Sequence, residues 1–310
     1  MNIYFPMISR RTFLLGTGVF MAAITLSPRN MLGAGRTPIQ RSIPSSGELL
    51  PVMGMGTWRT FDVGENPAAR EQLSEVIQEF FDNGGRIIDS SPMYGRSESV
   101  VGDLLKTTGN QKKVFAATKV WTDGRRNGIV QMQQSKHRLG VDVDLMQIHN
   151  LRDWKTHLPV LQEWKKQDRL RYIGITTSHG RYHEELEQIL ATEDLDFVQF
   201  TYNMEDRRAE ERLFPLAADN GIATLINRPF QGGHLFRKAQ GATLPEWSSE
   251  IGCRTWGQFF LKFIIGHPAV TCVIPATSKV HHMKDNMAAG FGHLPDKAIR
   301  ERMIRHYESL

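Results

Sequence analysis

The chain has 310 residues, of which 40% are hydrophobic, 9% aromatic and 23% charged. This composition is ordinary for a globular protein and excludes an intrinsically disordered or collagen-like chain. Two cysteines, Cys253 and Cys272, are too few for a disulfide scaffold or for a site with four cysteine ligands. The formal net charge is +5, but residues 1–35 hold three arginines and no acid, leaving 35 basic against 33 acidic residues elsewhere. No basic stripe remains, so nucleic-acid binding is not expected.

The first 35 residues have the layout of an export signal. Arg10 and Arg11 precede an uncharged run of 16 residues, Thr12–Ser27, which is shorter than the about 20 residues of a membrane-spanning helix. Small residues at 33–35 suit a cleavage site. The Ser-Arg-Arg-x-Phe-Leu pattern from Ser9 resembles the bacterial twin-arginine signal, which implies the twin-arginine export machinery as a partner and a periplasmic or otherwise exported protein. An uncleaved membrane anchor and a chance arginine pair are the alternatives.

Residues 36–310 read as a single domain of repeated strand–helix units. Eight short β-rich runs occur, at residues 51–57, 86–91, 114–119, 144–149, 172–176, 197–203, 222–227 and 270–275. Amphipathic helices are expected between them, among them Glu71–Phe81, Glu184–Leu190 and Ala209–Ala218. Strands alternating with helices at this spacing indicate parallel βαβ units. Eight units in about 275 residues predict an α/β fold, the (β/α)8 TIM barrel.

Three segments lie outside the repeat. Residues 41–52 have a Ser-Ser-Gly turn between extended flanks, which suits a β-hairpin at the barrel bottom. A long loop, Pro229–Arg254, precedes the last strand, and Phe236 and Trp247 in it are candidate pocket walls. The charged stretch Pro295–Leu310 has apolar residues on one face and predicts a closing C-terminal helix.

Polar residues at the ends of the predicted strands are the candidates for chemistry. The second strand ends in Asp89, with Tyr94 five residues later, and the next two end in Lys119 and His149. This set suits carbonyl reduction, in which a proton must reach the carbonyl oxygen. A lysine ammonium would lower the pKa of a tyrosine, an aspartate would hold the lysine, and a histidine could polarise the carbonyl. Any one of these residues alone is more often an ordinary ion pair or packing residue.

With these residues in view, the sequence resembles the aldo-keto reductase family. Asp89, Tyr94, Lys119 and His149 match the family's catalytic tetrad, and the resemblance extends over nearly all of the chain after residue 35. It implies an NAD(P)(H)-dependent oxidoreductase that reduces an aldehyde or ketone, or oxidises an alcohol, with Tyr94 as the general acid or base. It also implies a small-molecule substrate, and a monomer is expected. No metal is expected, because the adjacent histidines 281 and 282 point in different directions on a helix.

The resemblance also assigns the residues that contact the cofactor, NADP(H) or NAD(H). They are Thr57 and Trp58 at the pocket entrance, Thr176 and Thr177 at the nicotinamide amide, Gln199 beneath the ring, Asn227 beside it, and Pro275, Thr277, Ser278, His282, Asp285 and Asn286 at the pyrophosphate–adenosine end. Five positions depart from the family pattern. Thr176-Thr177 replaces a Ser-Asn pair, Asn227 replaces a stacking aromatic residue, and Ala276 and His282 replace basic residues that grip the 2′-phosphate. The preference between the two cofactors therefore stays open.

Two alternatives to a freely exchanging reductase remain. One is an exported barrel that binds the cofactor as a redox sensor without turnover, which the altered cofactor positions favour and the complete tetrad opposes. The other is an enzyme that carries a tightly held cofactor across the membrane and runs an internal redox cycle. The second alternative addresses the scarcity of free nicotinamide dinucleotides expected outside the cytoplasm.

Overall fold

The computed structural model describes residues 37–310, and the predicted export signal lies outside these residues. The described chain opens with an antiparallel hairpin, β1 (Gln40–Ser42) and β2 (Leu49–Pro51). Ile43 and Leu50 of this hairpin are fully buried against the N-terminal ends of the barrel strands, in one cluster with Ile87, Phe115 and Leu145. The hairpin therefore closes the bottom of the barrel, as predicted.

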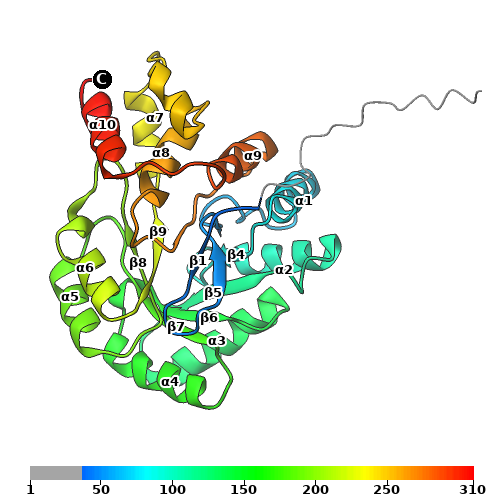
Figure 1. The fold of residues 1–310 in the computed structure, drawn as a ribbon. Helices are drawn as coiled ribbons and strands as arrows, with labels where there is room; N and C mark the ends of the chain where they lie inside the picture. Colours follow the sequence, from blue (N-terminus) through cyan, green and yellow to red (C-terminus); the bar gives the residue numbers. More distant parts are fainter. Residues whose placement is uncertain (1–36) are drawn as a thin grey trace, which may run out of the picture. The chain divides into compact units, whose positions relative to one another are not determined.

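Eight parallel strands make up the barrel (Figure 1). They are β3 (Met55–Gly56), β4 (Ile87–Asp89), β5 (Phe115–Val120), β6 (Leu145–Ile148), β7 (Tyr172–Thr176), β8 (Phe197–Thr201), β9 (Ala223–Asn227) and β10 (Cys272–Val273). Each strand pairs with the next along the chain. The gap between β10 and β3 is bridged by a parallel contact of Met53 with Val273 and by the Gly54 amide donating to the Val273 carbonyl at 2.8 Å. The predicted TIM barrel is confirmed.

The helices follow the strands in the expected order. α1 (Pro67–Asp82), α2 (Ser97–Thr108), α3 (Arg125–Leu139), α4 (Trp154–Lys166), α5 (His183–Thr192), α6 (Leu213–Asp219), α8 (Trp256–Ile265) and α9 (Val280–Ala288) follow β3 to β10 in turn. α1 shows why such segments form: five apolar residues at spacings of three and four are all buried, and Asn66 caps the first turn by accepting from the Ala69 amide. The C-terminal helix α10 (Lys297–Glu308) buries Met303 and Tyr307, as predicted.

Two expectations about elements were wrong in detail. The helix expected over Ala209–Ala218 is instead a short 3₁₀ turn, η2 (Arg208–Glu210), followed by α6 from Leu213. Pro215 explains the late start, because a proline has no amide hydrogen and is accommodated in the first helical turn, where that hydrogen lacks an acceptor. The long loop after β9 is also structured. It holds η3 (Gln231–Gly233), α7 (His234–Lys238) and η4 (Glu246–Ile251).

The barrel interior changes from apolar to polar along the strands. Alternate residues of a strand face the same side. On β4, Ile87 lies in the apolar bottom cluster and Asp89 one step higher; on β5, Phe115 and Ala117 precede Lys119. The same change occurs on β6 and β8, where Gln147 and Gln199 follow Leu145 and Phe197. A polar layer therefore sits at the C-terminal ends of the strands, where barrel enzymes place their sites.

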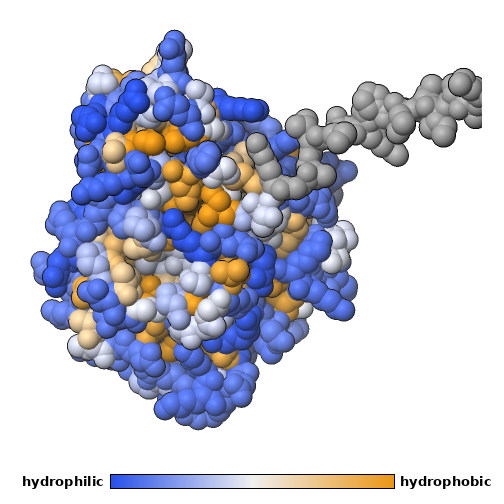
Figure 2. All heavy atoms as spheres, in the orientation of Figure 1, coloured by the Kyte–Doolittle hydropathy of each residue, from blue (hydrophilic) through white to orange (hydrophobic). Residues whose placement is uncertain are grey.

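No helix within residues 37–310 is long and apolar enough to cross a bilayer. The face shown in Figure 2 is mostly hydrophilic, and its apolar side chains fall into several separate groups. Scattered apolar residues of this kind are normal on a protein surface.

Candidate active site

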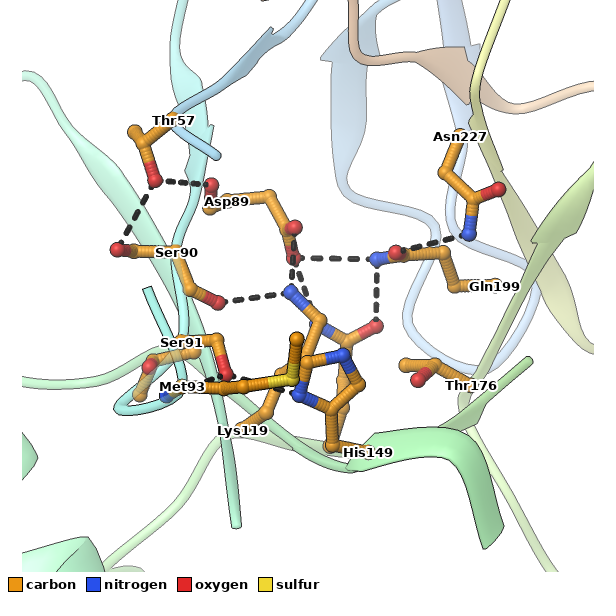
Figure 3. Close-up of polar contacts among 12 residues, drawn as sticks. Thr57, Asp89, Ser90, Ser91, Met93, Lys119, His149, Thr176, Gln199 and Asn227 are labelled. Carbon is orange, nitrogen blue, oxygen red and sulfur yellow. Dashed lines mark hydrogen bonds and ion pairs between the residues drawn. The ribbon is translucent and has the colours of Figure 1, made fainter. Parts of the chain in front are cut away.

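Asp89 is the centre of the polar layer. Its Oδ2 accepts from the Lys119 ammonium at 2.5 Å, and its Oδ1 accepts from the Gln147 amide at 2.9 Å and the Gln199 amide at 3.1 Å. Figure 3 shows the side chains of Lys119 and Gln199 pointing toward the Asp89 carboxylate. All of these side chains are buried. A buried carboxylate needs such partners, because an unpaired charge in the interior is costly.

Lys119 is held as a charged ammonium. Burial by itself lowers the pKa of this lysine, but Asp89 and Tyr94 together outweigh burial and the net shift is upward. The Lys119 ammonium also donates to the Ser90 carbonyl at 2.7 Å. The lysine is therefore a fixed positive charge in a site of low dielectric, as the sequence predicted.

Tyr94 lies directly beside this charge. The turn after β4 brings the Tyr94 amide to the Ser91 carbonyl at 2.9 Å, and the Lys119 Nζ lies 5.1 Å from the centroid of the tyrosine ring. Burial raises the pKa of Tyr94, and the Lys119 charge only partly opposes this. Lys119 lowers the pKa of Tyr94, as predicted, but burial raises that pKa by more, so the net shift is upward. The cause is desolvation, which the sequence does not show.

His149 faces Tyr94 across the pocket as a neutral imidazole. The centroids of the two rings are 5.7 Å apart and meet edge to face. Burial and the Lys119 charge lower the pKa of His149 to about 2. The Ser91 hydroxyl lies 2.9 Å from Nδ1, and its oxygen accepts from the Met93 amide. This hydroxyl can donate to Nδ1, and in that tautomer Nε2 carries the proton.

Tyr94, His149 and Asp89 line a cavity of about 510 Å³ at the top of the barrel. Six predicted cofactor residues line the same cavity: Thr57, Trp58, Thr176, Thr177, Gln199 and Asn227. A second cavity of about 660 Å³ shares the wall residues Phe230, Phe236 and Ala276 with the first, so the two lie side by side. The second is lined by Thr277, His282, Asp285 and Asn286. Together they give an extended molecule room to run from the polar layer to α9.

The polar groups in the first cavity fit the carboxamide end of a nicotinamide cofactor. The Thr177 Oγ1 is buried and has no hydrogen-bond partner, so it is available to a ligand. Thr176 Oγ1 is already used, because it accepts from the Asn150 amide at 3.1 Å. Asn227 donates to the Thr177 carbonyl at 2.8 Å and accepts from Thr201 at 2.7 Å. Asn227 therefore links neighbouring strands by hydrogen bonds, at the position where the family pattern has a stacking aromatic ring.

Some predicted contacts lie elsewhere. Pro275 and Ser278 line neither cavity, and the Pro275 carbonyl instead accepts from the Gly56 amide at 3.1 Å, which helps close the barrel. Asp285 accepts from Thr255 and Gln258 at 2.7 Å each. Trp247 does not line a cavity, because its ring packs 5.9 Å from that of Phe259, whereas Phe236 lines both. No cluster of potential metal ligands occurs in the described part of the chain.

Several site residues escaped the sequence analysis. Gln147 donates to Asp89, and Ser91 contacts His149. The strand period could have found Gln147, because it lies two residues before His149 and so faces the same side. Arg181 and Arg228 also line the first cavity, and only the folded loops bring them there.

Comparison with known proteins agrees with this geometry. The sequence profile of the Aldo/keto reductase family matches residues 52–302. The chain is 29% identical to aldo-keto reductase YhdN of Bacillus subtilis over 60% of each chain, and 26% identical to methylglyoxal reductase YeaE of Escherichia coli over 80% of this chain and 89% of that one. An aldo/keto reductase of Klebsiella pneumoniae, solved with NADP and acetate, superposes with a TM-score of 0.70 at 22% identity, covering 84% of this chain and 93% of that one. The chain therefore belongs to the aldo/keto reductase family of oxidoreductases, which interconvert carbonyl groups and alcohols.

Proposed function

We propose that this protein reduces a small aldehyde or ketone to its alcohol with NAD(P)H, and that Tyr94 delivers the proton to the carbonyl oxygen. The observation that carries the proposal is the placement of a buried, charged Lys119 beside Tyr94 at the edge of a cavity that His149 also lines. The methylglyoxal reductase among its relatives supports a small, reactive aldehyde as the substrate class.

The cofactor would supply the hydride, and residues of the chain would donate the proton and stabilise the group that donates it. The raised pKa of Tyr94 keeps its hydroxyl protonated at neutral pH, so that it can donate. The phenolate left after donation would face the Lys119 ammonium, which Asp89 keeps charged. The Nε2–H of neutral His149 would donate a hydrogen bond to the carbonyl oxygen and orient the substrate.

The two cavities would divide the cofactor between them. The buried Thr177 hydroxyl would serve the nicotinamide amide, with Gln199 beneath the ring. Thr277, His282 and Asn286 would serve the pyrophosphate–adenosine end in the second cavity. Burial lowers the pKa of His282, assisted by His281 and Lys279, so this residue carries little positive charge at neutral pH. We therefore expect the protein to prefer NADP(H) over NAD(H) only weakly.

We also propose that residues 1–35 are a twin-arginine signal and that the barrel acts outside the cytoplasm. The arginine pair and the short uncharged run support this. The alternative to free exchange is a cofactor that is loaded before export and tightly held, and such an enzyme would run an internal redox cycle. Denaturing the protein purified from its own compartment would release about one nicotinamide dinucleotide per chain, whereas an empty preparation would contradict a preloaded cofactor.

Steady-state turnover tests the proposed function. With NADPH or NADH and a series of small aldehydes, including methylglyoxal, absorbance at the dihydronicotinamide band should fall with saturable kinetics in aldehyde. Fluorescence titration of the same preparation gives the cofactor Kd. A protein that binds the cofactor but turns over no aldehyde and oxidises no alcohol would contradict the proposal and support the sensor alternative. The departures from the family pattern at Thr176, Asn227 and Ala276 favour that alternative.

A further inference from the structure

Three basic side chains line the first cavity opposite the β3 side. His179 and Arg181 lie in the loop after β7, and Arg228 directly follows β9. Within residues 37–310 neither arginine forms an ion pair, and the buried Nε of Arg228 has no hydrogen-bond partner. The guanidinium group of an ordinary surface arginine is normally hydrogen-bonded to water. A guanidinium with a buried, unused donor at a cavity wall is instead available to a ligand.

The nearest acid does not neutralise this group. Asp206 lies close enough to influence Arg228, but its two oxygens each accept from the Arg208 guanidinium at 3.1 Å. Burial lowers the pKa of Arg228, and the Arg181 charge lowers it further. Burial followed by the charges of Arg228 and Arg181 likewise lowers the pKa of His179. Arg181 and Arg228 therefore lie close enough to influence each other, and neither forms an ion pair with an acid of the described residues.

The two loops that carry the charges are fixed by the strand between them. The His179 amide donates to Thr201 of β8 at 2.9 Å, and the Arg228 carbonyl accepts from Asn203 just after β8 at 3.1 Å. Both residues have positive φ angles, 62° for His179 and 50° for Arg228. Such backbone is unfavourable for a residue other than glycine and persists only where the surroundings enforce it. The basic group is therefore preorganised on the scaffold.

We propose that Arg181 and Arg228, with His179, form a subsite for an oxyanion carried by the carbonyl substrate, either a carboxylate or a phosphate monoester. This inference rests on the proposed function. The three residues line the cavity that holds Tyr94 and His149 and do not line the second cavity, where the adenosine end of the cofactor is placed. A guanidinium matches both oxyanions through two parallel N–H···O bonds. The reaction would then favour aldehydes whose far end is anionic.

Matched aldehydes test the subsite. The probes are 4-carboxybenzaldehyde, 4-formylphenyl phosphate and the neutral 4-nitrobenzaldehyde, each assayed with the full-length wild type, Arg181→Gln, Arg228→Gln and Arg228→Lys. We expect the KM of at least one anionic aldehyde to rise tenfold or more in the two glutamine variants, with the neutral aldehyde within twofold. Arg228→Lys should recover part of the loss. The anionic aldehyde whose KM rises more identifies which oxyanion the subsite binds. Arg237→Gln is the control, because it removes an exposed arginine that lines neither cavity.

Two results would overturn the subsite without touching the proposed function. Equal losses for anionic and neutral aldehydes would show that the arginines only support the pocket. An unchanged aldehyde KM with a tenfold weaker cofactor Kd would show that they bind the cofactor's phosphates. If the wild type turns over none of the probes, calorimetry of benzoate and benzamide with the cofactor-loaded protein tests the subsite. Tighter binding of benzoate than of benzamide, abolished by Arg228→Gln, supports the subsite. Equal binding of benzoate and benzamide overturns it.

Discussion

At the scale of single residues, the site is organised around one buried carboxylate whose hydrogen-bond partners are protein side chains. Asp89 accepts hydrogen bonds from Lys119, Gln147 and Gln199. One buried charge therefore sets the positions of the lysine and of the two glutamine side chains. Removing one member of a buried ion pair typically costs about 3–5 kcal/mol, since the other charge is left unpaired. Asp89 is therefore a positioning residue, and Tyr94 and His149 are the groups placed to meet a carbonyl.

The protonation states of Tyr94 and His149 predict the pH profile. Burial and Lys119 hold the pKa of His149 near 2, and burial raises the pKa of Tyr94 above its usual value. The reducing form, neutral histidine with protonated tyrosine, should therefore persist across neutral pH. We expect kcat for aldehyde reduction to be flat between pH 5 and 9. An acid-side fall with an apparent pKa near the ordinary histidine value of about 6.5 would contradict this assignment.

The residue at position 282 predicts cofactor selectivity. Because the pKa of His282 is lowered, it offers a 2′-phosphate no fixed charge at neutral pH. His282→Arg should tighten NADPH binding about tenfold, since a charge-assisted hydrogen bond contributes about 1.5–3 kcal/mol, and should leave NADH within twofold. Fluorescence titration measures both values. Lys284→Arg, an exposed change on the same helix α9, is the control. Equal tightening of both cofactors would show that position 282 does not face the 2′-phosphate.

How far the sequence predicts the site differs from residue to residue. Asp89, Tyr94, Lys119 and His149 end or follow consecutive strands, and parallel strands bring such ends together, so their meeting was predictable. Gln147 escaped notice because a glutamine in a strand carries no chemical signature until its carboxylate partner is in place. The net rise in the pKa of Tyr94 could not be read either, since burial belongs to the fold and not to the motif.

At the scale of elements, periodicity predicted where helices exist better than where they begin. The five apolar residues expected on one face of α1 are all buried, because a spacing of three and four can only suit a helix against a core. The helix expected from Ala209 begins at Leu213, and the loop after β9 contains short helical turns. Strand lengths were overestimated at both ends of the sheet, where β3 and β10 have two residues each.

The contact between α2 and α3 predicts an inverted effect of a glycine substitution. Alanine in a helix interior is usually about 1 kcal/mol more favourable than glycine. A Cβ at Gly102 of α2, however, would lie 2.2 Å from the Arg138 carbonyl oxygen of α3, which is backbone and cannot rotate away. Gly102→Ala should therefore lower the free energy of unfolding by about 1–3 kcal/mol.

Urea unfolding followed by circular dichroism checks this value. Ser99→Ala is a suitable control, because Ser99 is a half-buried residue of the same helix. Its free energy of unfolding should change by less than about 0.5 kcal/mol. If Gly102→Ala proves as stable as the wild type or more so, helix propensity governs the position and the close approach of the two helices is wrong.

At the scale of the whole molecule, the proposed signal can be tested separately from the barrel. The residues that line both cavities belong to the described part of the chain, residues 37–310, and the proposed signal would supply only an address. Changing Arg10 and Arg11 together to lysine should leave the protein in the cytoplasm, with its reductase activity intact. Fractionation and immunoblotting measure this, and Arg29→Lys is a control that keeps the pair. Identical fractionation of all three proteins would contradict a twin-arginine signal.

The central claim is that Tyr94 is the proton donor, and Tyr94→Phe tests it most directly. Removing one hydroxyl beside Lys119 should lower kcat for aldehyde reduction by about 10² to 10⁴, the usual contribution of general acid catalysis. The cofactor Kd should stay within threefold, and Tyr182→Phe, which changes an exposed tyrosine that does not line the cavity, should keep wild-type turnover. A Tyr94→Phe enzyme with kcat within a few-fold of the wild type would contradict the mechanism.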